Sequence, residues 1–231
     1  MPRLLELFAG TGSVGRAFKK LGWEVVSVDI DPKTGASHVV DILLWNYGLY
    51  ARGYYDFVWA SPVCQHYSVA RTTGPPRDLH APDRLVQRAL DLINYFGCNW
   101  AMENPQSGLL KGRDIVKGLP YVDTSYCKFG YVYRKNTRIW TSLAICLHAP
   151  CSLKNPCSAM VGKRHPMTAQ QSRRSCDPTD KANVCSQKQL YSIPELLCDE
   201  IAQAAQSANV RLMVNDAGDE GAPPPTPVRQ I

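Results

Sequence analysis

The stretch Leu4-Leu5-Glu6-Leu7-Phe8-Ala9-Gly10-Thr11-Gly12-Ser13 decides the fold class. A short apolar run leads into a glycine-rich turn, and apolar residues then recur at helical spacing through 13–21. Short apolar runs continue to alternate with helical patterns along the chain, at 23–29, 55–60, 83–96 and 99–102. This alternation predicts an α/β protein with a doubly wound, mostly parallel sheet that helices cover on both faces.

The glycine-rich turn has the properties of a ligand site. Gly10 and Gly12 let the backbone approach a ligand closely, and the helix that follows favours negative charge at its N-terminus. Asp29 ends the second predicted strand, where a carboxylate can accept hydrogen bonds from two ribose hydroxyls. With Gly15 the spacing also satisfies the G-x-G-x-x-G pattern of dinucleotide-binding proteins. A nucleotide-like cofactor at this edge of the sheet is therefore predicted.

A second informative segment, Ala-Ser-Pro-Val-Cys-Gln-His-Tyr-Ser at 60–68, follows the apolar run 55–59. A strand that ends in a proline turn and presents one thiol is an arrangement suited to a nucleophile. A cysteine at a strand end is by itself most often a small buried hydrophobe. Next to a cofactor turn, however, Cys64 favours covalent chemistry, and a hydride-transfer enzyme has no use for such a thiol.

Composition limits the remaining possibilities. The 231 residues suffice for one α/β domain with a small accessory region, and no apolar run approaches the roughly 20 residues that span a bilayer. Nine cysteines without an export signal predict reduced thiols in an intracellular protein, in the cytoplasm or the nucleus. We expect a monomer without membrane contact. The net charge of +6 only weakly favours a nucleic-acid partner.

The pattern along the chain predicts four regions. Residues 1–145 form the catalytic core, and 146–190 form a small, irregular insert that is rich in cysteine and basic residues. Residues 191–214 form a C-terminal helix that returns to the core. Residues 215–231 are acidic and then proline-rich, which predicts a disordered tail.

Several motifs, in order along the chain, resemble those of the cytosine-C5 DNA methyltransferases. The segment 8–12 is similar to their first motif, and 61–68 to their catalytic Pro-Pro-Cys-Gln-x-Phe-Ser, with Val63 in place of the second proline. The segment 102–105 resembles their Glu-Asn-Val motif, 138–140 their Arg-x-Arg-Ile-Tyr motif, and 193–196 the start of their last helix. The insert is smaller than their usual target-recognition region, and the Gly-Asn-Ser before the last helix is missing.

The resemblance implies a reaction and a set of site residues. A methyl group would pass from S-adenosylmethionine to C5 of a cytosine flipped out of double-stranded DNA, through a covalent adduct between Cys64 and C6. Glu103 would bind N3 and the exocyclic amine, and Arg138 would bind O2. The implied cofactor contacts are Phe8, Ala9, Gly10, Thr11, Gly12, Ser13, Asp29, Ile30, Asp41, Ile42 and Pro62.

Other functions stay open from the sequence alone. An RNA (tRNA) cytosine-C5 methyltransferase would share these motifs, so RNA is not excluded as a substrate. A catalytically weak DNA-binding homologue would share the fold, although the retained Cys64 favours activity. Enzymes that methylate exocyclic amines are a further alternative. Their motif at this turn is similar to Ser-Pro-Pro-Tyr, whereas this chain has Cys64 in the fourth position.

The insert also contains candidate metal ligands. Cys146, Cys151 and Cys157 lie within twelve residues of one another and His165 follows, a set that could bind a structural zinc ion. Cys176 or Cys185 could substitute for one of them. None of the spacings is the C-x₂-C pattern that makes a zinc prediction strong, so plain reduced cysteines are the competing interpretation.

Overall fold

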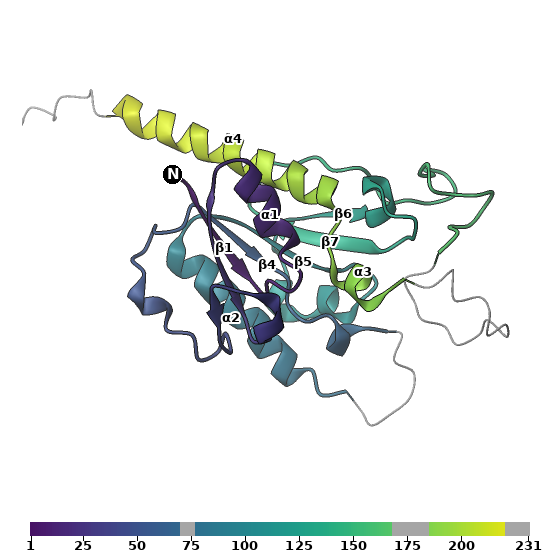
Figure 1. Cartoon of the computed structure of the whole chain (residues 1–231), viewed down its shortest axis with the longest axis horizontal. Helices are drawn as coiled ribbons and strands as arrows, with labels where there is room; N and C mark the ends of the chain where they lie inside the picture. The colour runs from purple at the N-terminus through teal and green to yellow at the C-terminus, as the bar shows by residue number, and fades with distance from the viewer. Residues whose placement is uncertain (70–76, 168–184, 220–231) are drawn as a thin grey trace, which may run out of the picture.

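The computed structural model describes residues 1–69, 77–167 and 185–219, and these form one layered α/β unit (Figure 1). Its central sheet has seven strands in the order β3-β2-β1-β4-β5-β7-β6. The strands are β1 (Arg3–Leu7), β2 (Glu24–Asp29), β3 (His38–Val39), β4 (Phe57–Ala60), β5 (Asn99–Pro105), β6 (Tyr121–Ser125) and β7 (Asn136–Thr141). Strands β1 to β5 pair in parallel, whereas β7 runs antiparallel to both β5 and β6. The predicted doubly wound, mostly parallel sheet is confirmed.

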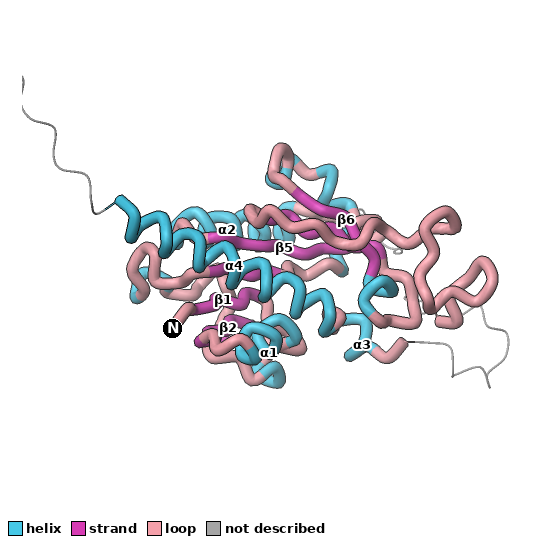
Figure 2. The backbone as a smooth tube through the Cα atoms, turned by 90° about the horizontal axis from the view of Figure 1, so that it is seen from above, coloured by secondary structure: helices cyan, strands magenta, loops and turns pink. Residues whose placement is uncertain are grey.

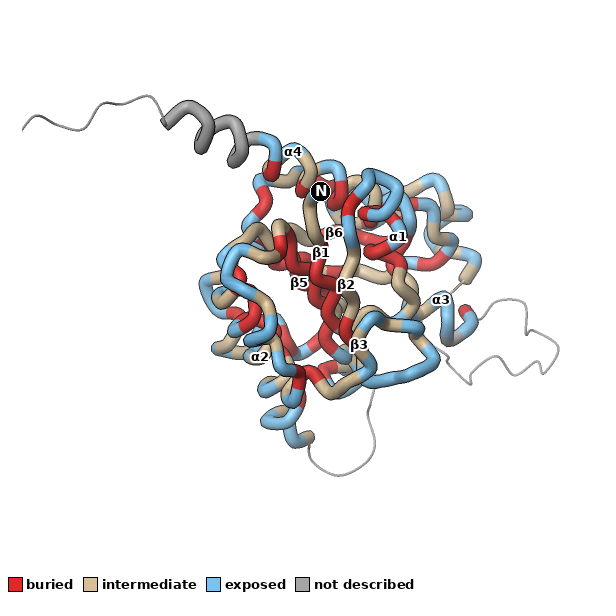
Figure 3. The backbone as a smooth tube through the Cα atoms, turned by 60° about the vertical axis from the view of Figure 1, so that its left-hand side comes forward, coloured by how far each residue is buried: buried red, intermediate tan, exposed pale blue. Residues whose placement is uncertain are grey.

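Helices cover both faces of the sheet, as Figures 1 and 2 show. On one face, α1 (Ser13–Lys20) packs beside α4 (Glu195–Asp219), and their apolar side chains join Leu4, Phe57 and Ile139 in one core cluster. On the other face, α2 (His80–Phe96) covers a second cluster that includes Leu5, Val58 and Met102. The sheet between them is almost completely buried at its centre, in β1, β4 and β5 (Figure 3).

The direction of the strands brings several loops to one edge of the sheet. The carboxyl ends of the parallel strands β1, β2, β4 and β5 lie at that edge. Because β7 is antiparallel to β5, its first residues lie at the same edge. The turns after β1 and β4 therefore meet the end of β5 and the start of β7, although these segments are far apart in the sequence.

The accessory regions differ in part from the sequence prediction. The described part of the insert, 146–167, contains loops and two isolated bridges, Tyr133 with Met167 and Val161 with Arg164, as expected for an irregular unit. The tail prediction is wrong for 215–219, because α4 continues to Asp219. No proline interrupts 195–219, so nothing in the sequence ends the helix near 214. The rest of the predicted tail, 220–231, lies outside the described residues.

No helix in the described part of the chain is long and apolar enough to cross a membrane.

Candidate active site

The turn after β1 has an unusual backbone. Gly10 and Gly12 have φ angles of 51° and 65°, which only glycine adopts without penalty, and Phe8 also has a positive φ of 57°. Asp29 at the end of β2 fixes this turn, because its Oδ2 accepts a hydrogen bond from the backbone N–H of Gly10 at 2.8 Å. The two predicted cofactor elements are thus physically connected.

A cavity of about 450 Å³ opens beside this turn, a size typical of small-molecule sites. Of the residues implied as cofactor contacts, all line it except Gly12, which shapes the turn and becomes the N-terminal neighbour of α1. Besides Cys64 and Glu103, the cavity has lining residues to which the sequence interpretation assigned no role, namely Glu6, Val14, Val28, Val40, Trp59, Ser61, Val63, Gln65, Leu85, Lys135, Leu190, Tyr191 and Ile193.

The cavity wall suits S-adenosylmethionine. Asp29 and Asp41 each place a carboxylate there, and Asp41 Oδ1 also accepts the backbone N–H of Leu43 at 2.9 Å. Phe8, Ile30 and Ile42 add apolar surface to the same cavity wall. Carboxylates for the ribose hydroxyls and the adenine amine, with apolar walls for the ring, are the groups that a nucleoside requires. The residues present therefore fit this cofactor.

Cys64 reaches the same cavity from the turn after β4. The side chain of Asn104 holds that turn, because its Nδ2 donates to the carbonyl oxygen of Pro62 at 2.8 Å. Burial raises the pKa of the Cys64 thiol above its ordinary value of 9.0, the positive charge of Lys135 lowers it, and the negative charge of Glu103 raises it. The thiolate, which is the nucleophilic form, thus depends on Lys135.

Glu103 lies near the end of β5, is 5% exposed and lines the cavity. Its Oε1 accepts a hydrogen bond from the hydroxyl of Tyr126 at 3.0 Å and another from the hydroxyl of Thr137. Both donors are themselves buried. A carboxylate anchored through one oxygen has a fixed orientation, so Glu103 is a preorganised hydrogen-bonding group beside Cys64.

Lys135 is the cationic side chain that the sequence interpretation missed. Its Nζ donates to the carbonyl oxygen of Leu190 at 3.3 Å and lies 4.5 Å from the centroid of the Tyr126 ring. It lines the cavity and directly precedes β7. An ammonium group in this place is the donor available to an oxygen of a ligand bound next to Cys64 and Glu103.

Arg138 is not brought together with Cys64 and Glu103. Glu103 is directly opposite Ile139 in the sheet, whereas Arg138 is opposite Asn104. Successive side chains of a strand point to opposite faces, so Lys135, Thr137 and Ile139 share the face of Glu103 and Arg138 points away from it. Arg138 instead makes a two-bond ion pair with Asp123, at 2.7 and 2.8 Å. The interpretation of Arg138 as a base-binding residue is corrected for this reason. Once Ile139 is known to lie opposite Glu103, the alternation of side chains places Lys135 on the same face.

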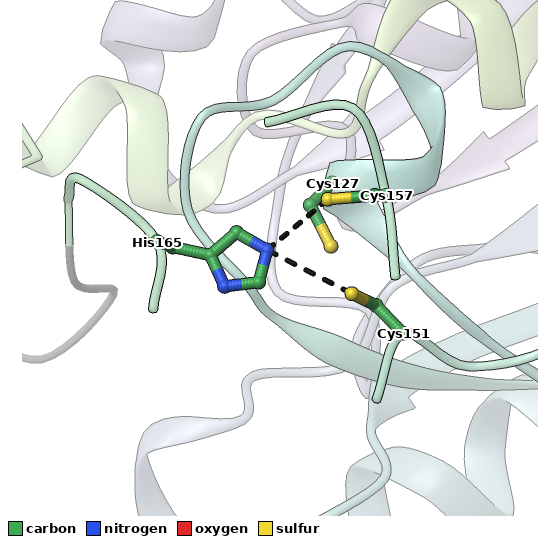
Figure 4. A group of neighbouring side chains, drawn as sticks. All are labelled: Cys127, Cys151, Cys157 and His165. Atoms are coloured by element: carbon green, nitrogen blue, oxygen red, sulfur yellow. Dashed lines mark hydrogen bonds between the residues drawn. The ribbon is translucent and has the colours of Figure 1, made fainter. Parts of the chain in front are cut away.

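The predicted metal ligands also need one correction. The structure brings together Cys127, Cys151, Cys157 and His165, with their ligand atoms within 4.8 Å of one another (Figure 4). Cys146 is exposed and lies outside this group. Cys127 lies two residues after the end of β6 and takes the place of Cys146 in the group. It does so because the loop from 151 to 165 folds back on the end of that strand. No spacing rule links Cys127 to the insert, so no sequence pattern indicates it as a ligand.

The comparisons with known proteins concern the family and the fold. No family model matches the chain. A curated relative from Frog virus 3 (isolate Goorha), described as a probable DNA (cytosine-5)-methyltransferase, is 33% identical over 174 residues, which are 68% of this chain and 78% of the relative. The chain belongs to the cytosine-C5 DNA methyltransferases. This family consists of enzymes that use S-adenosylmethionine, so the predicted family, fold class and enzyme class are confirmed.

Solved structures of methyltransferases show more distant similarity. A prophage-encoded chain (E. coli) described as a DNA modification methyltransferase is 16% identical with a TM-score of 0.47, over 63% of this chain and 49% of that one. Dnmt2 of S. pombe is 16% identical with a TM-score of 0.43, over 65% of this chain and 53% of that one. The chain thus spans about half the length of those solved chains.

Proposed function

We propose that the chain methylates C5 of cytosine in DNA through a covalent bond between Cys64 and C6 of the base. The observation that carries the proposal is that Cys64, Glu103 and Lys135 line the same cavity as Asp29 and Asp41. A nucleophile, an oriented carboxylate and a cation thus lie next to a pocket that fits a nucleoside. All five residues come from the carboxyl edge of the sheet or the loops that meet it.

Each residue has a role that its surroundings support. The Cys64 thiolate adds to C6 of the base, which raises the electron density at C5. Glu103 donates a carboxyl proton to N3 and accepts a hydrogen bond from the exocyclic amine, which neutralises the negative charge that develops in the base during the attack. Lys135 takes the role first assigned to Arg138: it donates to O2 of the base and stabilises the thiolate. S-adenosylmethionine, when bound, supplies the electrophilic methyl group that C5 takes up. Water then takes the C5 proton, the electrons of that bond re-form the C5–C6 double bond, and Cys64 leaves C6 as the thiolate.

DNA is the substrate that the family favours. The described part of the insert carries three exposed basic side chains, Lys154, Lys163 and Arg164. Basic side chains on loops beside an active site are suited to phosphate contacts. The target base must leave the duplex to reach Cys64, because that thiol lies in a cavity and not on a protruding surface.

Trapping of a covalent complex tests the proposal. The full chain is incubated with S-adenosylmethionine and DNA that contains 5-fluorocytosine, because fluorine at C5 cannot leave as a proton. A complex that survives denaturation is expected with the wild-type protein and with the matched control Cys98→Ser. Cys98 directly precedes β5, at the end of the strand that is far from Glu103. Cys64→Ser is expected to form none, while its affinity for the cofactor stays unchanged.

Three substrates distinguish the possible targets. Methyl transfer from labelled cofactor is measured in parallel on duplex DNA, single-stranded DNA and tRNA. We expect duplex DNA to be the preferred acceptor. Transfer to tRNA alone would replace DNA by RNA as the substrate while leaving the chemistry of Cys64 intact. Normal turnover by Cys64→Ser would contradict the covalent mechanism itself.

A further inference from the structure

Four side chains outside the active-site cavity form a compact group of metal-ligand atoms. Cys127 belongs to the turn after β6, Cys151 and Cys157 belong to the loop of the insert, and His165 follows eight residues later. Their three sulfur atoms and one imidazole nitrogen all lie within 4.8 Å of one another. Figure 4 shows the ring of His165 directed at the sulfur atoms.

The separations match those of a tetrahedral zinc site. His165 Nε2 lies 3.2 Å from Cys157 Sγ and 3.8 Å from Cys151 Sγ. Zn–S bonds of about 2.3 Å in a tetrahedron place neighbouring sulfur atoms about 3.8 Å apart. Since no two ligand atoms are more than 4.8 Å apart, adjustments of at most about 1 Å give that geometry.

The four ligands form a closed set. Three thiolates and one imidazole are a common combination in structural zinc sites, and they leave no position for water or substrate. Three cysteines cannot all pair as disulfides, so oxidation would leave one thiol over. Disulfide formation could use only two of the four residues, whereas coordination of one metal ion uses all of them.

The region around the cluster has almost no apolar core of its own. In the described part of the insert, 146–167, the buried apolar side chains are Leu147 and Cys151, and the regular structure consists of isolated bridges. A segment that cannot build its own core is commonly held by a metal or a disulfide. Crosslinking Cys127 to this loop would attach the insert to the end of β6.

We propose that Cys127, Cys151, Cys157 and His165 bind one structural zinc ion that fixes the insert to the sheet. The ion holds the loops that carry Lys154, Lys163 and Arg164 against the end of β6, where Cys151 already donates its backbone N–H to Ser125. It also crosslinks the turn that contains Tyr126, the hydrogen-bond donor to Glu103. The zinc ion takes no part in methyl transfer, so its presence does not depend on the proposed activity.

Metal analysis of the full-length protein tests the site, after purification without chelators or metal-affinity resins. We expect one zinc ion per chain in the wild type and in Cys146→Ser, the matched control with an exposed cysteine outside the cluster. Cys157→Ser is expected to lose most of the zinc, and so is His165→Gln. Both residues are only partly buried, so these replacements disturb packing less than changes at Cys127 or Cys151.

Cobalt titration of the chelator-treated wild-type chain gives a readout that does not require a variant to fold. One equivalent of Co²⁺ should produce the strong visible bands of tetrahedral coordination and a thiolate charge-transfer band, and Zn²⁺ should displace it. Chelation should also lower the unfolding temperature of the wild type, because binding energy at such a site is folding energy.

Three results would overturn the proposal. The first is zinc below about a tenth of an equivalent in a folded wild type, since a structural site is expected to be full. The second is iron in place of zinc, and the third is loss of zinc from Cys146→Ser to the same extent as from Cys157→Ser. None of these measurements involves methyl transfer, so failure of the zinc site and failure of the proposed activity are distinguishable.

Discussion

The ammonium group of Lys135 lies 4.5 Å from the centroid of the Tyr126 ring, and Tyr126 donates a hydrogen bond to Glu103. Tyr126 therefore contacts both charged groups whose electrostatic effects reach the Cys64 thiol, Glu103 through its hydroxyl and Lys135 through its ring. The cation and the carboxylate have opposite effects on the pKa of that thiol, so their placement sets how much thiolate is present at neutral pH.

Lys135→Gln should slow methyl transfer about 10²-fold at neutral pH, the typical effect of losing one preorganised donor. The rate of the wild type should rise with pH, because burial raises the pKa of Cys64 and the thiolate is the reactive form. Removing Lys135 removes an effect that lowers this pKa, so the inflection should move to higher pH. Single-turnover rates across a pH series measure both effects.

Arg138→Gln is the matched control for Lys135→Gln. Its side chain points to the opposite face, and its loss leaves Asp123 without the ion pair. We expect a less stable protein whose pH inflection is unchanged. An inflection that moves in Arg138→Gln and stays fixed in Lys135→Gln would reverse the assignment of the two residues.

Asn104→Ala should slow formation of the covalent complex with 5-fluorocytosine DNA. The variant loses the hydrogen bond to Pro62 that holds the catalytic turn, and the free energy of unfolding should fall by about 1–3 kcal/mol. The affinity for S-adenosylmethionine, measured by calorimetry, should stay near that of the wild type. A normal trapping rate in a destabilised protein would show that Asn104 does not position Cys64.

Asp29→Ala should weaken S-adenosylmethionine binding by about 1–3 kcal/mol, the range for leaving buried polar groups without a partner. The variant loses a carboxylate on the cavity wall and also the acceptor of the Gly10 N–H. Asp31→Ala is the control, because Asp31 caps a short turn and does not line the cavity. Calorimetric titration that gives equal affinities for the two variants would remove Asp29 from the site.

Glu6 should make the stability of the fold decrease with rising pH. Burial is the main cause that raises its pKa from an ordinary 4.5 to about 7, so the folded state holds a proton that the unfolded chain has lost. The free energy of unfolding should therefore fall as pH rises from 4.5 to 7, by up to about 3 kcal/mol. Urea denaturation at a series of pH values should show a smaller decrease in Glu6→Gln. Parallel curves for the two proteins would assign the decrease to other groups.

The elements that depend on local sequence were predictable. The turn after β1, the thiol after β4 and the carboxylate at the end of β2 are each determined by residues next to one another, and their strands meet because the sheet is parallel. The roles of Lys135 and Arg138 depend on the face to which β7 turns each side chain, and that follows from its pairing with β5. Motif similarity alone selects Arg138 as the cation, and Arg138 lies on the opposite face of the sheet from Glu103.

The metal ligands show the same limit more clearly. Cys151, Cys157 and His165 are close in sequence and were predicted together. Cys127 is separated from them by β7 and joins them only because the insert folds back on the end of β6. Nothing in the spacing distinguishes it from Cys146, which is nearer in sequence but exposed.

The antiparallel direction of β7 has a consequence for how the cavity is assembled. Its lining residues come from 6–85, which include the turns after β1 and β4, and from 103–193, which include Glu103 and Lys135. Because β7 starts at the shared edge, the second half of the chain reaches the cavity without contributing to the turn after β1. A fragment that ends before β5 would therefore keep Asp29, Asp41 and Cys64 but lack Glu103 and Lys135, so neither half of the chain forms the complete cavity wall.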